Sequence, residues 1–269
     1  MRAPDPAPMT SDQTSGSSTL GTPVPPADSP YWRFYNAVAA AQLAQWLPEE
    51  PARVLDVSAG RRFVAQLSAA GHDVLHVLES AAPPPEVPGP GRLVPVVADS
   101  RSLEWLGDEC VDLVLAESRA LSLCLATEVT VEGLVRVLRP GGRLLLVVDS
   151  LMLGLARLAE QGRWAELADA PSADVVLVSA DDGTIRRCFW PEELRSLLDD
   201  AGLVVDWVRP RSVLNPATVE RALLRGGETA LRTLVRTEVE LAVEREGEST
   251  GLHLVASARR PDRAAGQAD

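Results

Sequence analysis

The feature that most constrains this chain is an alternation of short aliphatic runs with amphipathic segments, which begins near residue 53. The runs are rich in Val and Leu, as strands are when both faces of a parallel sheet are buried. Between them, apolar residues recur at three- and four-residue spacing, which is typical of helices. Strands are expected at 53–57, 74–77, 93–97, 111–116, 143–148, 203–208 and 252–258. The pattern predicts an α/β fold with a doubly wound, mostly parallel sheet of seven strands, of which the last is antiparallel.

The organisation along the chain predicts one domain between residues 31 and 260. Residues 1–30 are rich in Pro, Ser, Thr and Gly and hold few large apolar side chains, so they cannot offset the entropy cost of ordering. We therefore expect disordered tails at 1–30 and 261–269. The regular alternation is interrupted at 150–190 and 209–250. We expect these insertions to form a cap over a substrate pocket or the surface of a homodimer.

Composition narrows the range of partners and compartments. The formal net charge of −12 gives no broad attraction to phosphate backbones, so we expect no nucleic-acid partner. No apolar run approaches the ~18 residues of a membrane span, and no charged start followed by an apolar stretch marks a secretory signal. Cys110, Cys124 and Cys188 form no CxxC pair and are typical of reduced thiols. These observations predict a cytoplasmic protein without a membrane partner.

Acidic side chains at the ends of the expected strands mark the candidate binding site. Ligands of open parallel sheets bind at the carboxyl ends of the strands, and the first strand runs into the segment DVSAG at 56–60. An acid within an aliphatic strand is costly to bury without partners, so Asp56 is expected to accept hydrogen bonds there. Asp99 and Ser100 follow the third strand, and the helix-breaking segment RPGG at 139–142 precedes the fifth.

In this order, these elements resemble the class I (Rossmann-like) S-adenosylmethionine-dependent methyltransferases. The similarity spans about residues 50–210, and the RPGG segment is its most specific part. The turn keeps a single glycine, with a serine where that family has its first glycine, so the cofactor loop is degenerate. The resemblance implies a methyltransferase-like domain with S-adenosylmethionine as its cofactor. The cofactor-binding residues that it implies are Asp56, Ser58, Gly60, Glu79, Asp99 and Ser100.

Several of these residues also have a purely structural interpretation. Asp56 either caps the turn that follows it or orients the amino group of the cofactor. Glu79 either accepts hydrogen bonds from the ribose hydroxyls or is a solvated loop acid. Asp99 either contacts the adenine amine or caps a helix.

The resemblance also places the methyl acceptor just beyond the fourth strand. Glu117 and Arg119 lie there, and they form either a site with a general base or a surface ion pair. Tyr31 and Tyr35 lie on an N-terminal helix that either covers the cofactor or belongs to the core. Methyl transfer depends on alignment and exclusion of water more than on a catalytic triad, so no catalytic residue is assigned. We expect the acceptor to be a small molecule.

Other functions share parts of this pattern. A non-catalytic binding or scaffold protein of the same fold, with a decayed cofactor site, is the main alternative, and the single glycine supports it. A nicotinamide-dependent dehydrogenase also uses a doubly wound sheet, but the G-x-G-x-x-G turn that it needs is absent. His72 and His76 are four residues apart, yet around a strand this spacing does not favour a shared metal ion, and no metal site is expected.

Overall fold

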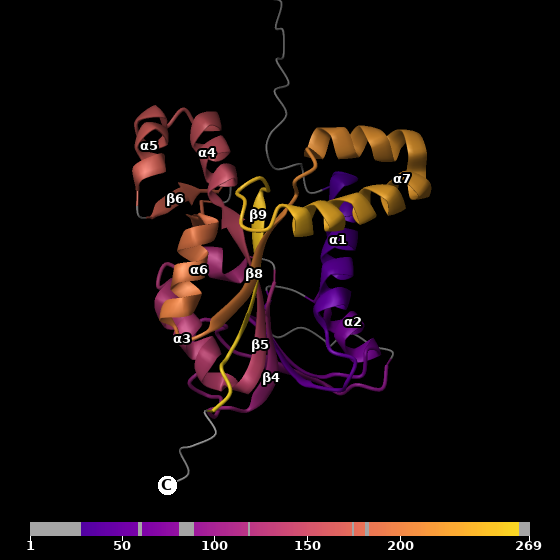
Figure 1. The fold of residues 1–269 in the computed structure, drawn as a ribbon, viewed down its shortest axis with the longest axis vertical. Helices are drawn as coiled ribbons and strands as arrows, with labels where there is room; N and C mark the ends of the chain where they lie inside the picture. Colours follow the sequence, from indigo (N-terminus) through magenta and orange to yellow (C-terminus); the bar gives the residue numbers. More distant parts are fainter. Residues whose placement is uncertain are drawn as a thin grey trace, which may run out of the picture.

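The computed structural model describes residues 28–58, 61–80, 89–117, 119–173, 175–180 and 183–263. Their strands join in one nine-stranded sheet with helices on both faces (Figure 1). The strands are β1 (Arg53–Asp56), β2 (Asp73–Leu78), β3 (Leu93–Val97), β4 (Val111–Ala116), β5 (Leu138–Ser150), β6 (Val176–Ser179), β7 (Ile185–Phe189), β8 (Val204–Arg211) and β9 (His253–Arg259). The helices are α1 (Tyr31–Trp46), α2 (Val64–Ala69), α3 (Thr127–Val137), α4 (Leu151–Glu160), α5 (Trp164–Asp169), α6 (Pro191–Asp200) and α7 (Pro216–Glu244), with the 3-10 helices η1 (Ala120–Leu123) and η2 (Ala170–Ser172). The predicted tails lie outside the described residues except for 28–30 and 261–263, so their disorder stays a prediction.

A core of seven strands confirms the predicted fold class. The parallel strands follow the order β3-β2-β1-β4-β5, and β9 then pairs antiparallel with both β5 and β8. The direction of strand order reverses between β1 and β4. In open α/β sheets, ligands bind outside the carboxyl ends of the strands at such a switch point.

Side chains that alternate along the central strands fill two separate cores. On β5, Leu144 and Leu146 pack in one core with residues of α3 and α6, whereas Leu145 and Val147 pack in the other with residues of α1 and α2. In Figure 1, α3 and α6 accordingly lie on one side of the sheet, and α1 and α2 lie on the other. Both faces of β5 are therefore buried, which is why its sequence is a continuous aliphatic run.

An added hairpin extends the sheet beyond the seven core strands. β6 and β7 pair antiparallel with each other, and β7 joins the last residues of β5. The apolar run at 175–178 has the character of a strand, and β6 covers most of it, whereas β7 has no such signature because Arg186 and Arg187 interrupt its aliphatic character. Arg187 forms ion pairs with Glu128 at 2.8 Å and with Glu193 at 2.9 Å. Together with α4 and α5, this hairpin makes up most of the insertion at 150–190.

The second insertion consists mainly of the long helix α7, which packs against α1. Gly227 has a φ of 52° and a ψ of −132°, so the helix is broken there into the two arms seen in Figure 1. Val219, Leu231 and Val239 of α7 pack with the aromatic side chains of α1. The insertion is thus anchored to the domain by apolar contacts, and its role as a cap or a dimer surface stays a prediction.

The RPGG segment at 139–142 lies inside β5 rather than before it. The strand begins at Leu138, pairs there with β4, and after a register shift resumes regular pairing at Arg143. Gly141 has a φ of 75°, which L side chains rarely adopt. A Cβ at Gly142 would lie 2.8 Å from a backbone carbonyl oxygen. The strand start expected at 143 is therefore corrected to 138, because the glycines let the chain bulge without leaving the sheet.

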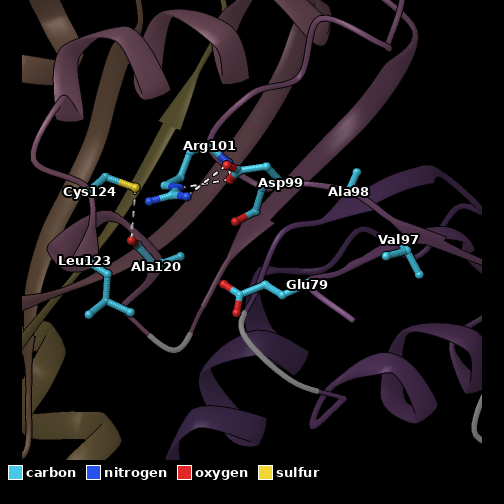
Figure 2. Close-up of a pocket in the computed structure, with 9 residues that line it drawn as sticks. Glu79, Val97, Ala98, Asp99, Arg101, Ala120, Leu123 and Cys124 are labelled. Atoms are coloured by element: carbon cyan, nitrogen blue, oxygen red, sulfur yellow. Dashed lines mark hydrogen bonds and ion pairs between the residues drawn. The ribbon is translucent and has the colours of Figure 1, made fainter. Parts of the chain in front are cut away.

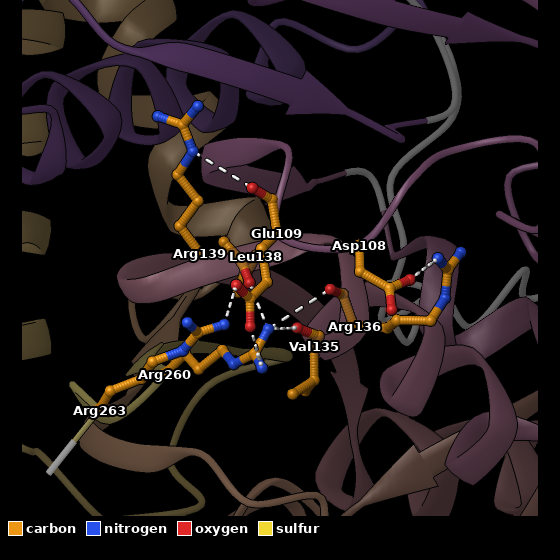
Figure 3. Close-up of polar contacts among 8 residues, drawn as sticks. All are labelled: Asp108, Glu109, Val135, Arg136, Leu138, Arg139, Arg260 and Arg263. Atoms are coloured by element: carbon orange, nitrogen blue, oxygen red, sulfur yellow. Dashed lines mark hydrogen bonds and ion pairs between the residues drawn. The ribbon is translucent and has the colours of Figure 1, made fainter. Parts of the chain in front are cut away.

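Arg260 ties the end of β9 to this corner (Figure 3). Its Nη1 donates to the carbonyl oxygens of Leu138 at 2.5 Å and Val135 at 3.2 Å, and its Nη2 donates to the Glu109 carboxylate at 3.0 Å. Because α3 ends at Val137, the last carbonyls of that helix lack donors within it. Arg260, which directly follows β9, supplies donors to these carbonyls.

Replacing Arg260 with alanine should lower the free energy of unfolding by about 1–3 kcal/mol, because charge-assisted hydrogen bonds to these carbonyls are lost. Arg263→Ala is the matched control. Its guanidinium bonds the same Glu109 at 2.6 Å but is 77% exposed, so we expect a loss below about 0.5 kcal/mol. Urea denaturation followed by circular dichroism measures both losses. Equal losses from the two variants would contradict the capping role of Arg260.

Candidate functional site

A buried pair of side chains on neighbouring strands supports the end of β1. Asp56 Oδ1 accepts a hydrogen bond from the Ser58 amide at 2.9 Å, and Asp56 Oδ2 lies 3.0 Å from His76 Nδ1. Asp56 and His76 are adjacent in the pairing of β1 with β2, and both are buried. Asp56 therefore caps the turn, which is one of its two predicted roles. Its partner His76 was not predicted, although both residues lie in predicted strands.

Ser58 connects this pair to the end of β4. Its Oγ accepts a hydrogen bond from the Glu117 amide at 2.9 Å, and the side chain is buried. The serine thus adds a side-chain hydrogen bond, which a glycine could not make, to the backbone hydrogen bond from the Val57 amide to the Leu115 carbonyl at 2.9 Å. Gly60 lies outside the described residues, so its role in the cofactor loop stays a prediction.

A cavity of about 600 Å³ opens at the carboxyl ends of β2 and β3 (Figure 2). Three residues predicted for the cofactor, Glu79, Asp99 and Ser100, meet in its wall. Asp56 and Ser58 are buried and are not part of that wall. The full lining consists of Glu79, Val97, Ala98, Asp99, Ser100, Arg101, Ala120, Leu123 and Cys124.

Arg101 holds the Asp99 carboxylate inside this cavity. Its Nε and Nη2 each donate to one carboxylate oxygen at 2.9 Å, and its backbone amide donates to Oδ1 at 2.9 Å. These hydrogen bonds hold the pKa of Asp99 below its ordinary value, so the side chain stays ionised at neutral pH. The side chain is still 49% exposed, and a carboxylate has lone pairs for further donors. Residues 100–110 form no helix, so the helix-cap alternative for Asp99 is wrong.

Glu117 lies in a buried ion pair beyond β4. Arg211 Nη2 donates to Glu117 Oε1 at 2.8 Å, and Nη1 donates to Oε2 at 3.2 Å. Gln42 accepts from Arg211 Nε at 2.7 Å, and the Tyr35 hydroxyl accepts from Nη1 at 3.5 Å. Both charged side chains are at most 1% exposed, so the predicted surface ion pair of Glu117 is wrong. The arrangement also argues against the general-base role, because both carboxylate oxygens are engaged and neither faces solvent.

Tyr31 and Tyr35 belong to the core rather than to the cavity wall. Their exposed fractions are 1% and 4%. Tyr31 packs against Phe34 in the cluster between α1 and α7, and Tyr35 contacts the Arg211 guanidinium and the His253 ring. The core alternative therefore accounts for this aromatic helix.

A second polar cluster, which the sequence did not indicate, surrounds Asp149 at the end of β5. Its buried carboxylate lies 3.5 Å from Arg119, 3.6 Å from Arg186 and 3.6 Å from His253. His253 is opposite Asp149 in the antiparallel pairing of β9 with β5. Arg119, a predicted substrate residue, therefore lies among charged side chains that come from separate strands.

Comparison with known proteins identifies the fold. No family model and no curated protein matches the sequence. Among solved structures, the chain is similar to 1,6-didemethyltoxoflavin-N1-methyltransferase of Burkholderia thailandensis, at 21% identity over 87% of this chain and 80% of that chain, with a TM-score of 0.52. It is also similar to S-adenosylmethionine-dependent methyltransferases of Methanosarcina mazei (19% identity, 82% and 98% covered, TM-score 0.53) and Mesorhizobium loti (16%, 84% and 100%, 0.53). The chain has the class I methyltransferase fold.

Among the described residues, no group of three His, Cys, Asp or Glu side chains is arranged to hold a metal ion. None of the helices in the described part of the chain is both long and apolar enough to cross a membrane. The Burkholderia structure of the same fold contains S-adenosylhomocysteine and 1,6-didemethyltoxoflavin.

Proposed function

We propose that this chain is an S-adenosylmethionine-dependent methyltransferase with a small-molecule acceptor. The observation that carries the proposal is the position of two carboxylates. Glu79 and Asp99 follow the adjacent strands β2 and β3, and both line one cavity of about 600 Å³ on a class I methyltransferase fold. Carboxylates at this edge of the sheet provide the acceptors that a nucleoside requires.

The residues of the cavity fit the chemistry of the cofactor. Glu79 can accept hydrogen bonds from two ribose hydroxyls, and Asp99 can accept one from the exocyclic amine of adenine. Val97, Ala98 and Leu123 supply apolar surface against which a base can pack. Asp56 acts indirectly, because its hydrogen bond to the Ser58 amide sets the shape of the turn beside the cavity.

The chain's contribution to the reaction is mainly alignment and exclusion of water. S-adenosylmethionine supplies a methyl group that is already activated on a sulfonium. A protein accelerates its transfer chiefly by holding the acceptor in line with the methyl group in a dry site. The insertions at 150–190 and 209–250 are proposed to supply this cover, and the acceptor is proposed to lie near Arg119.

Two observations support a small-molecule acceptor over a nucleic acid or a membrane. The net charge of −12 gives no broad attraction to polyanions. The similar Burkholderia enzyme contains a small heterocyclic ligand. A radiolabelled-methyl assay against a cell extract, separated into small-molecule and macromolecular fractions, tests this assignment. Label found only in RNA or protein would contradict it.

A non-catalytic binding protein is the second candidate, and the Asp99–Arg101 pair is the observation that favours it. The guanidinium occupies both carboxylate oxygens from inside the cavity. In this alternative, Arg101 closes the adenine position and the cofactor does not bind.

Asp99→Ala should weaken binding of S-adenosylhomocysteine by about 5- to 150-fold, which corresponds to about 1–3 kcal/mol for a hydrogen bond to a charged group. Isothermal titration of the wild type, Asp99→Ala and Arg101→Ala measures this. Arg92→Ala, an exposed substitution at the opposite end of β3, is the control and should change nothing. Binding that is absent in the wild type but present in Arg101→Ala would favour the non-catalytic candidate.

A further inference from the structure

The cluster around Asp149 contains more positive than negative charge. Glu117 and Arg211 neutralise each other through two hydrogen bonds. Asp149 is then the carboxylate that faces Arg119 and Arg186, at 3.5 Å and 3.6 Å. A third guanidinium, that of Arg157 on α4, is 7% exposed and forms no ion pair with any described residue. In a chain whose net charge is −12, this local excess of cations is unexpected.

Among the described residues, several polar atoms of the cluster have no hydrogen-bond partner. Neither oxygen of Asp149 accepts a hydrogen bond, and the Nε atoms of Arg157 and Arg186 have no acceptor. Buried polar groups are normally hydrogen-bonded, and buried cations are normally paired. The two guanidinium donors that lack an acceptor, in a cluster with more cations than anions, indicate that an acceptor group completes their hydrogen bonds.

His253 adds no positive charge to the cluster. Burial lowers its pKa well below the ordinary value, and the guanidiniums of Arg119, Arg211, Arg186 and Arg157 lower it further. The imidazole therefore remains neutral, and two guanidiniums, those of Arg119 and Arg186, face the Asp149 carboxylate.

The cluster lies next to the cofactor cavity. Arg119 follows β4, Asp149 is at the end of β5, and Arg186 is on β7, so all three come from the same edge of the sheet. Arg119 has a φ of 64° and directly precedes Ala120, which lines the cavity. Its side chain is 23% exposed and that of Arg186 is 13% exposed, so neither guanidinium is fully enclosed by the described residues. Non-glycine residues held in this backbone region are often found at binding sites.

We infer that the methyl acceptor carries an oxyanion, a carboxylate or a phosphate, which binds to Arg119, Arg157 and Arg186 beside the cofactor cavity. The identification of this ligand as the methyl acceptor rests on the proposed function. The binding of an oxyanion to these arginines does not depend on methyl transfer. Guanidiniums bind both groups through paired N–H donors, so the chemistry is shared. Asp149 attracts the guanidiniums of Arg119 and Arg186 to one side of the site, and the ligand supplies the acceptors that the Nε atoms of Arg157 and Arg186 lack.

Direct titration of the full chain with inorganic phosphate and with benzoate, each without cofactor, tests the subsite and distinguishes the two oxyanions. We expect one of the two to bind, and Arg186→Gln and Arg119→Gln each to weaken that binding at least tenfold. Arg163→Gln is the control, because Arg163 is a partly exposed arginine of the same insertion that pairs with Glu166. It should leave the affinity unchanged. Circular dichroism confirms that each variant is folded.

Asp149→Asn should change the anion affinity in the opposite direction in the same assay. Removing the carboxylate raises the positive charge of the subsite, so the bound anion should bind several-fold more tightly. If neither anion binds the wild type, or if Arg163→Gln weakens binding as much as Arg186→Gln, the inference is overturned. Anion binding without binding of S-adenosylhomocysteine would reject the proposed methyltransferase function and leave the subsite standing, whereas the reverse result would reject the subsite alone.

Discussion

Arg211→Met should lower the free energy of unfolding by about 3–5 kcal/mol, the largest effect expected from a single substitution in this chain. The variant removes the guanidinium that bonds both oxygens of Glu117, so the buried carboxylate loses this two-point ion pair. It also removes the donor to Gln42 at 2.7 Å, which links β8 to α1. Urea denaturation of the purified variant, followed by tryptophan fluorescence, measures the loss.

Two further variants separate the ion pair from simple truncation. Arg209→Met shortens an arginine two residues away that is 24% exposed and pairs with Glu246 at 3.2 Å, so it should cost at most about 1 kcal/mol. Adding Glu117→Leu to Arg211→Met removes the buried carboxylate as well and should recover at least about 1 kcal/mol. An Arg211→Met loss no greater than that of Arg209→Met would show that the buried pair does not stabilise the fold.

Asp56→Ala should lower the free energy of unfolding by about 2–5 kcal/mol, because it leaves the Ser58 amide and the His76 ring buried without their partner. Asp56→Asn should restore much of this loss. An amide oxygen can still accept from Ser58, and an amide nitrogen can donate to His76 Nδ1. The comparison therefore measures how much of the effect is hydrogen bonding and how much is charge.

Asp73→Ala is the matched control for Asp56→Ala. Asp73 also accepts a backbone hydrogen bond, from the Arg92 amide at 3.0 Å, but it is exposed at the opposite end of β2. We expect a loss of about 1 kcal/mol or less. Equal losses for the two alanine variants, or no recovery with Asp56→Asn, would contradict the role assigned to the buried pair.

Much of the sheet was predictable because strands buried on both faces have a local signature. Leu144 to Val148 are apolar at every position, since successive side chains fill opposite cores. β7 lacked this signature, because ion pairs rather than apolar contacts hold Arg187. The start of β5 was displaced by five residues in the prediction, because Gly141 and Gly142 allow a bulge within the sheet where a helix-breaking segment usually indicates a turn.

The candidate site was predictable only in part. Asp56, Glu79 and Asp99 were found because each is an acid at or near the end of an aliphatic run, and the topology of parallel strands brings such ends to one edge. The partners of those acids were not found. Arg101, which bonds Asp99, is two residues away and is indistinguishable in the sequence from any solvated arginine.

The sequence by itself determined the seven core strands and their order along the chain, because these follow from local hydrophobic patterns and chain connectivity. Only the tertiary structure decided which charges meet. Glu117 and Arg211 are 94 residues apart, and Asp149 and His253 meet because β9 inserts antiparallel beside β5. Charge pairing depends on strand order, register and burial, which a local pattern does not encode. The same residues that a sequence presents as surface charges can therefore form the most deeply buried polar contacts of the fold.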